Sequence, residues 1–175
     1  VLEDHLRAGE ILFSLAVAYA RHAGISEFPQ QILMKQIVLS RRSLGLFQHH
    51  DGITGTGKDF VMADYGNKML RAINLMKDVI RRCGEFLATK DKTTYTYVEG
   101  SPMFDIDEDI PSYDSLPLKK VILADEQGRP FLLYNSLHHT RKQVARIYVN
   151  YPHVEVRDAE GNPVMTQRSE ERRVG

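Results

Sequence analysis

The sequence has 175 residues, 42% of them apolar and 26% charged, a composition that favours a folded protein over a disordered tail. Because Lys plus Arg and Asp plus Glu both number 23, no positive surplus favours nucleic-acid binding. The single cysteine, Cys83, excludes an internal disulfide and a cysteine-based zinc finger, and the longest apolar stretch, from Ile11 to Ala20, is too short to span a membrane.

The first half of the chain has the periodicity of three helices. Apolar residues recur every three or four positions, which predicts helices over residues 2–22, over 29–48 and from residue 62 to about 90. Gly24 is expected to end the first helix, and Pro29 suits the first turn of the second. Short loops between the helices predict an antiparallel three-helix bundle over residues 1–90. The apolar stripes consist of Leu2, Leu6, Leu12, Leu15, Ala16 and Tyr19, then Leu33, Ile37, Leu44 and Phe47, then Met62, Tyr65, Met69, Ile73, Met76, Ile80, Cys83 and Leu87.

The second half has a different character. Residues 91–118 contain prolines and many acidic residues, and we expect a connector there. Residues 119–167 hold short β-branched and aromatic runs, at 121–123, 131–134, 147–149, 154–156 and 164–166, which predict the start of an antiparallel β-sandwich domain. The expected fold class is therefore α+β.

Both ends of the sequence suggest an internal fragment. It opens with Val1 rather than methionine, inside an expected helix. Residues 168–175 break the strand pattern and match the translation of a common sequencing-adapter oligonucleotide. We expect this tail to be non-native.

One loop, at residues 48–59, holds the residues best suited to chemistry. His49, His50 and Asp51 are adjacent, and imidazole and carboxylate groups both bind zinc. Neighbouring positions at a helix end point about 100° apart, so we expect at most two of the three to reach one ion. Because one loop offers fewer than the usual four ligands, spacing alone favours a polar turn beside the negative end of the helix dipole.

Three other patterns suggest weaker alternatives. Residues 52–58 fit the G-x-x-x-x-G-K core of a nucleotide-binding P-loop, but Asp59 replaces the required Ser or Thr and a helix, not a strand, is expected before it. Asp105, Asp107 and Asp109 imitate half of a calcium loop without its glycine and glutamate, which favours a solvated connector. The pair at 138–139, two histidines, is interpreted as part of a surface turn.

A long match in the loop resembles a known family. Leu44-Gly-Leu-Phe-Gln-His-His-Asp-Gly-Ile-Thr-Gly-Thr-Gly-Lys-Asp-Phe60, followed by Asp64-Tyr65-Gly66, resembles the signature of glycoside hydrolase family 38, the class II α-mannosidases. The similarity extends more weakly from Leu6 to Gln167. The loop is more similar to the Golgi branch than to the lysosomal branch. The resemblance implies the end of the catalytic region, the three-helix middle domain and the start of the C-terminal β domain.

The resemblance also implies roles for the loop residues. His50 corresponds to the family's zinc ligand, Asp51 to a residue that binds mannose hydroxyls, and His49 to a substrate-lining position. The family's nucleophile and remaining zinc ligands lie upstream, so no catalytic carboxylate is assigned in this chain. Gly52 and Gly57 stand where the family usually has alanine, which suggests a more flexible loop.

The function that the resemblance implies is zinc-dependent, retaining hydrolysis of terminal α-mannosyl linkages during N-glycan processing. The implied location is the Golgi lumen, with the lysosome or secretion as alternatives. The implied partners are a mannose-containing N-glycan and the rest of the parent polypeptide, with no nucleic acid and no membrane segment. We expect the chain alone to be inactive. The alternatives are a non-catalytic carbohydrate-binding or scaffolding module and, more remotely, the P-loop nucleotide binder.

Overall fold

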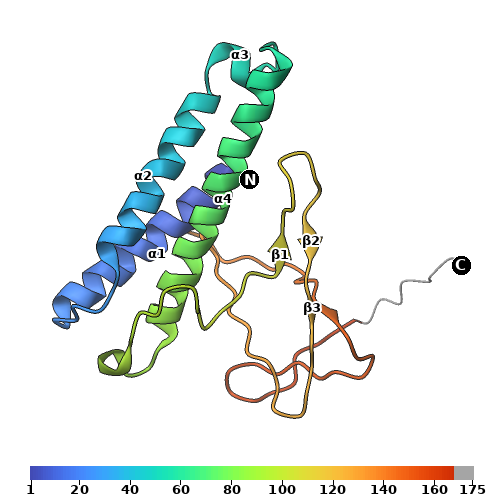
Figure 1. Ribbon diagram of the computed structural model, residues 1–175. Coiled ribbons are helices and arrows are strands. Elements are labelled where there is room, and N and C mark those ends of the chain that lie inside the picture. The colour runs from blue at the N-terminus through green and yellow to red at the C-terminus, as the bar shows by residue number, and fades with distance from the viewer. Residues whose placement is uncertain (168–175) are drawn as a thin grey trace, which may run out of the picture. The chain divides into compact units, whose positions relative to one another are not determined.

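The computed structural model describes residues 1–167, so the expected non-native tail at 168–175 lies outside the described residues. The chain divides into two compact units. The first unit holds residues 1–120 and 132–144, and the second holds residues 121–131 and 145–167. The four α-helices found in the described residues belong to the first unit (Figure 1). Within residues 1–167, none of the helices has the length and apolar character needed to cross a membrane.

Three long helices and one short one make up the helical part: α1 at Leu2–His22, α2 at Gln30–Phe47, α3 at His50–Ile53 and α4 at Asp59–Ala88 (Figure 1). The predicted stop after α1 is confirmed. Gly24 has a φ of 66°, in the left-handed region that glycine adopts without strain. The second predicted start is also confirmed, because α2 begins directly after Pro29.

The three long helices alternate in direction. Gln36 in α2 hydrogen-bonds to Asp78, while Ser40, one turn later, bonds to the carbonyl of Ala72, so α2 and α4 run antiparallel. Gly9 of α1 lies beside Met76, and an added Cβ would come within 2.3 Å of that methionine's terminal methyl. The predicted three-helix packing and the α+β fold class are therefore confirmed.

A tyrosine near the end of α1 gives the direction of the remaining helix. Tyr19 stacks edge-on against Phe86 with ring centroids 6.2 Å apart. Gly9, earlier in α1, lies beside Met76, earlier in α4. Later residues of α1 therefore contact later residues of α4, and the two helices run parallel.

The core fills the space among these helices. Two residues that were predicted to face this core from α1 do not: Leu15 is 53% exposed and Tyr19 is 48% exposed. Phe13 and Ala20 are buried in α1 instead. A helix has 3.6 residues per turn, so residues chosen by steps of three or four do not all lie on the same side of it. The buried apolar residues are Leu2, Leu6, Leu12, Phe13, Ala16, Ala20, Phe28, Leu33, Ile37, Ala72, Ile73, Met76, Val79, Cys83, Phe86 and Tyr95.

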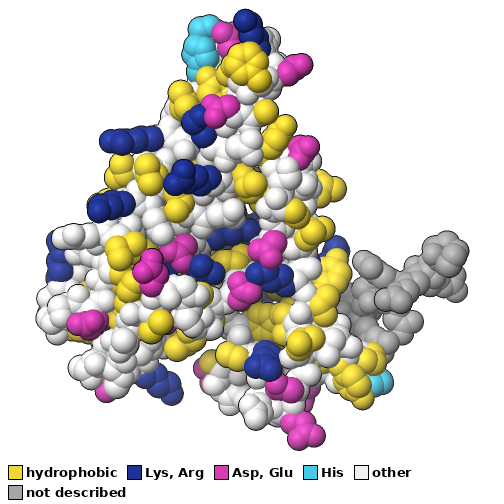
Figure 2. Space-filling view, viewed as in Figure 1, with side chains coloured by type: hydrophobic (Ala, Val, Ile, Leu, Met, Phe, Trp, Pro, Cys, Tyr) yellow, Lys and Arg dark blue, Asp and Glu magenta, His cyan; other side chains and the backbone are white. Residues whose placement is uncertain are grey.

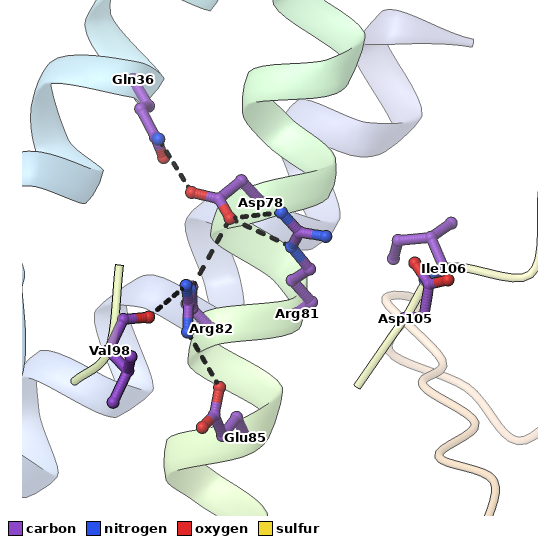
Figure 3. Close-up of polar contacts among 8 residues, drawn as sticks. All are labelled: Gln36, Asp78, Arg81, Arg82, Glu85, Val98, Asp105 and Ile106. Carbon is purple, nitrogen blue, oxygen red and sulfur yellow. Dashed lines mark hydrogen bonds and ion pairs between the residues drawn. The ribbon is translucent and has the colours of Figure 1, made fainter. Parts of the chain in front are cut away.

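A buried polar network links α4 to the segment that follows it (Figure 3). Arg82 has a side chain only 2% exposed, and its Nη1 lies 3.5 Å from a carboxylate oxygen of Glu85. Its Nη2 donates a 2.7 Å hydrogen bond to the carbonyl of Val98. Asp78 lies on the other side of the guanidinium, 3.7 Å from Nε, and accepts a hydrogen bond from Gln36. Burial of a charge is tolerated only with such partners.

The expected connector contains its own structure. It includes a short 3-10 helix at Lys92–Thr94 and an antiparallel pair, β1 at Glu108–Asp109 with β2 at Leu118–Lys119. Lys119 and Lys120 form ion pairs with the acidic side chains of this hairpin. The acidic run that sequence reasoning treated as solvated is thus partly neutralised by lysines.

Up to residue 167, the second unit contains one pair of short strands, β3 at Val121–Ile122 and β4 at Tyr148–Val149. They pair in parallel, whereas the sequence predicted antiparallel strands. An isolated antiparallel bridge joins Arg157 to Pro163. The predicted runs at 131–134, 154–156 and 164–166 form no strands, because a strand needs a hydrogen-bonded neighbour and the described residues supply too few.

Candidate functional site

The candidate site is the connection between α2 and α4, and it is built on a break in the helix. α2 ends at Phe47, earlier than the histidines that sequence reasoning placed at its end. His49 has a φ of −53° and a ψ of 140°, which turns the chain before the four-residue helix α3. Backbone N–H groups of Gly52 and Ile53 donate to the His49 carbonyl at 2.8 and 3.0 Å and close this turn.

The break brings the three candidate ligands together. The rings of His49 and His50 lie with centroids 4.2 Å apart. Oδ2 of Asp51 is 3.5 Å from Nε2 of each histidine. One potential ligand atom from each residue lies within 4.8 Å of the others. His49 lies outside the helix, so the 100° spacing rule does not apply to it, and the expectation that at most two of the three bind one ion stays a prediction.

The donor types are ones that zinc accepts, and two of the three separations suit it. Two donors about 2.0–2.1 Å from a tetrahedral zinc lie roughly 3.4 Å apart, close to the 3.5 Å between Asp51 and each histidine. Two imidazoles and a carboxylate give three ligands, and a structural or catalytic zinc site needs a fourth from protein or water. Within residues 1–167 no other cluster of three such groups occurs.

The site is open to solvent. The side chains of His50, His49 and Asp51 are 81%, 46% and 51% exposed. Figure 2 shows histidine side chains on the surface at the end of the bundle where Figure 1 places α3. An exposed cluster leaves an ion accessible to further ligands and to a substrate, and it does not by itself hold a metal tightly.

Packing against α4 holds α3 in place. Phe47 and Tyr65 stack edge to face with centroids 6.0 Å apart. Gly52 is buried between them, where an added Cβ would lie 2.7 Å from the Phe47 carbonyl oxygen. Neither Gly52 nor Gly57 has a positive φ, and the loop uses the left-handed region only at Gly55, with a φ of 68°. The two glycines singled out from the sequence therefore do not set the turn.

Two threonine hydroxyls complete the loop, and sequence reasoning assigned them no role. Thr56 donates a 3.0 Å hydrogen bond to Oδ1 of Asp51. The hydroxyl of Thr54 lies 2.9 Å from that of Thr56 and also donates to the His50 carbonyl. The signal in the sequence was the pair of threonines within five residues of the aspartate.

The alternative motifs find no support in the geometry. Residues 52–58 follow a helix rather than a strand, and Asp59 is the first residue of α4, so the P-loop arrangement is absent from this part of the chain. Asp105 and Asp107 pair with lysines at 2.8 and 2.6 Å, which occupies the carboxylates of the calcium-like run. His138 and His139 are exposed and belong to no ligand cluster within the described residues.

Comparison with known proteins identifies the family. Residues 1–87 match the family model described as the alpha mannosidase middle domain. The chain is 41% identical over 170 residues to alpha-mannosidase 2x of Mus musculus and 38% identical over 169 residues to alpha-mannosidase 2 of Homo sapiens. The chain belongs to the α-mannosidase family. Alpha-mannosidase 2 of Drosophila melanogaster is 32% identical over 173 residues.

These relatives of the α-mannosidase family are much longer than this chain. In each case the match takes in 97% of this chain but only 15% of the relative. The matching family model ends at residue 87, at the end of α4, and includes the whole loop that carries the candidate ligands. No solved structure matches the chain significantly.

Proposed function

We propose that this chain is part of a zinc-dependent, retaining α-mannosidase that hydrolyses terminal α-mannosyl linkages in N-glycan processing. The observation that carries the proposal is the convergence of His49, His50 and Asp51 in the loop of a chain that belongs to the α-mannosidase family. The proposed location is the Golgi lumen.

The proposed roles are those that the resemblance of the loop to the α-mannosidase signature implies. His50 serves as the zinc ligand, and its imidazole is accessible to an ion. Asp51 binds hydroxyl groups of the mannose, because an ionised carboxylate accepts up to four hydrogen bonds. His49 lines the same site. A zinc ion held there would bind sugar hydroxyls and help distort the ring toward the oxocarbenium-like transition state.

The rest of the reaction needs groups outside this chain. Retaining glycosidases use two carboxyl groups about 5–5.5 Å apart, a nucleophile and an acid/base. Within the described residues, Asp51 is the only carboxylate in the candidate cluster. We therefore propose that the nucleophile, the acid/base and the remaining zinc ligands come from other parts of a longer polypeptide, and that the 175 residues alone do not hydrolyse mannosides.

The test uses the full-length protein that contains this chain. His50→Ala is compared with His139→Ala, which removes an exposed histidine from another tandem pair that has no carboxylate partner. We expect His50→Ala to lose bound zinc on dialysis against a chelator and to cut hydrolysis of an aryl α-mannoside by about 100-fold or more, as the loss of a metal ligand should. The His139→Ala protein should behave as wild type.

The alternative of a non-catalytic carbohydrate-binding or scaffolding module predicts a different result. The exposed loop and the incomplete donor set favour it as the second candidate. In that case His50→Ala would leave both zinc content and hydrolysis unchanged. Loss of hydrolysis with full zinc content would keep the enzyme assignment and reject His50 as the ligand.

A further inference from the structure

The carboxylate of Asp51 is held on one side only. Its Oδ1 accepts the 3.0 Å hydrogen bond from the Thr56 hydroxyl, while Oδ2 lies 3.5 Å from both imidazoles. The two oxygens therefore have different tasks: one is held by the loop, and the other faces the imidazoles.

The direction of the hydrogen bonds around Thr56 is fixed by proton count. An ionised carboxylate only accepts, so the single hydroxyl proton of Thr56 goes to Asp51. Thr54 gives its own single hydroxyl proton to the His50 carbonyl, so the 2.9 Å contact between the two threonine oxygens is not a donated hydrogen bond.

The backbone supports the same arrangement. Gly57 donates its N–H to the carbonyl of Asp51 at 3.0 Å, which closes the loop over six residues. Gly55, with its φ of 68°, turns the chain so that Thr56 comes back toward Asp51. The backbone conformation of the loop thus brings Thr56 within hydrogen-bonding distance of the Asp51 carboxylate.

We infer that Thr56 is a positioning residue, whose hydroxyl fixes the rotation of the Asp51 carboxylate so that Oδ2 faces the sugar and metal side of the site. The inference rests on the proposed function, because it assigns Thr56 a task through Asp51. Without the hydroxyl the carboxylate is free to rotate, and each binding event must order it again.

The matched control is already present in the chain. Thr93 donates a 2.6 Å hydrogen bond from its hydroxyl to Oδ1 of Asp91, two residues earlier, at the start of the 3-10 helix. Thr93→Val removes the same kind of exposed threonine-to-aspartate bond outside the candidate cluster. Any general effect of losing such a bond will appear in both variants.

The experiment measures binding of methyl α-mannoside to the zinc-loaded full-length protein by calorimetry, and zinc affinity by competition with a chelator. We expect Thr56→Val to weaken mannoside binding about threefold to tenfold, the range for the net contribution of one typical, solvent-exposed hydrogen bond. Thr56→Ser should restore binding to within about twofold of wild type. Thr93→Val should bind as wild type.

A double-mutant cycle separates positioning from general support. With Asp51→Ala already present, Thr56→Val should weaken binding by less than about twofold, because the hydroxyl then has no carboxylate to orient. An undiminished loss in that background, an equal loss in Thr93→Val, or wild-type binding by Thr56→Val overturns the inference. So does failure of both Thr56→Val and Thr56→Ala to fold, which would make the role structural.

Failure of the proposed function has a separate signature. If His50→Ala retains zinc and activity, the site assignment fails, and the role of Thr56 fails with it. If His50→Ala loses zinc while Thr56→Val binds mannoside normally, only the inference about Thr56 is wrong.

Discussion

Arg82 of α4 donates a 2.7 Å hydrogen bond to the carbonyl of Val98, sixteen residues further along the chain. The guanidinium also lies 4.9 Å from the centre of the Tyr97 ring. One buried cation therefore fastens the start of the connector to the end of the helical bundle.

Replacing Arg82 by methionine should destabilise the chain strongly. Its loss leaves the buried carboxylate of Glu85 without its partner, which costs about 3 kcal/mol in comparable buried pairs. Urea denaturation of the 175-residue chain measures the change. The control is Arg81→Met, where the side chain is 28% exposed and the expected loss is below about 1 kcal/mol. Equal losses for the two variants would contradict this role of the network.

Tyr95 presents the opposite case, a buried polar atom without a partner. Its ring packs edge-on against Phe86 at 5.0 Å, and its hydroxyl is buried with no hydrogen-bond partner among residues 1–167. Tyr95→Phe keeps the ring contacts and removes the unsatisfied oxygen. We expect unfolding free energy to rise by about 1 kcal/mol, measured by urea denaturation at pH 7. Tyr97→Phe, at a less buried ring, should change little, and a clear loss of stability in Tyr95→Phe would show that its hydroxyl is satisfied.

Cys83 makes stability depend on alkaline pH. Burial, together with the negative charge of Asp78, raises the pKa of its thiol from 9.0 to about 12. The unfolded thiol ionises above pH 9 while the folded thiol keeps its proton, so this contribution is complete below pH 9 and is lost as pH rises toward 12. Burial likewise raises the pKa of Tyr95 from 10.0 to about 12.

The measurement is unfolding free energy at pH 8, 9, 10 and 11 for wild type and Cys83→Ala. The alanine variant should be less stable at pH 8, because it leaves a small cavity. Its stability should fall less steeply above pH 9, by about 1 kcal/mol per pH unit or less. Parallel curves for the two proteins would show that the thiol does not titrate between these limits.

The helices were predictable because their apolar residues follow the geometry of one element. Leu33 and Ile37 of α2, and Ile73 and Met76 of α4, lie buried where the periodicity placed them. Leu15 was wrongly predicted to be buried. The side of a helix that becomes covered depends on neighbouring elements, and the local sequence pattern does not show them. The β runs failed for a related reason, since strand formation depends on partners distant in sequence.

The candidate site was predictable in its residues but not in its geometry. The family resemblance selected His49, His50 and Asp51, and the structure places these three together. The end of α2 was predicted to within one residue, but the turn at His49 and the short helix α3 were not, because nothing in the apolar pattern marks them. The role of Thr56 depends on a hydrogen bond across five residues of loop, which composition alone does not specify.

The most direct test of the zinc assignment is a crystal structure of the zinc-loaded full-length protein, with diffraction measured at the zinc absorption edge. The account predicts an anomalous peak about 2.0–2.1 Å from an imidazole nitrogen of His50, beside the end of α2. A zinc peak whose ligands do not include His50, with that ring turned toward solvent, would contradict it.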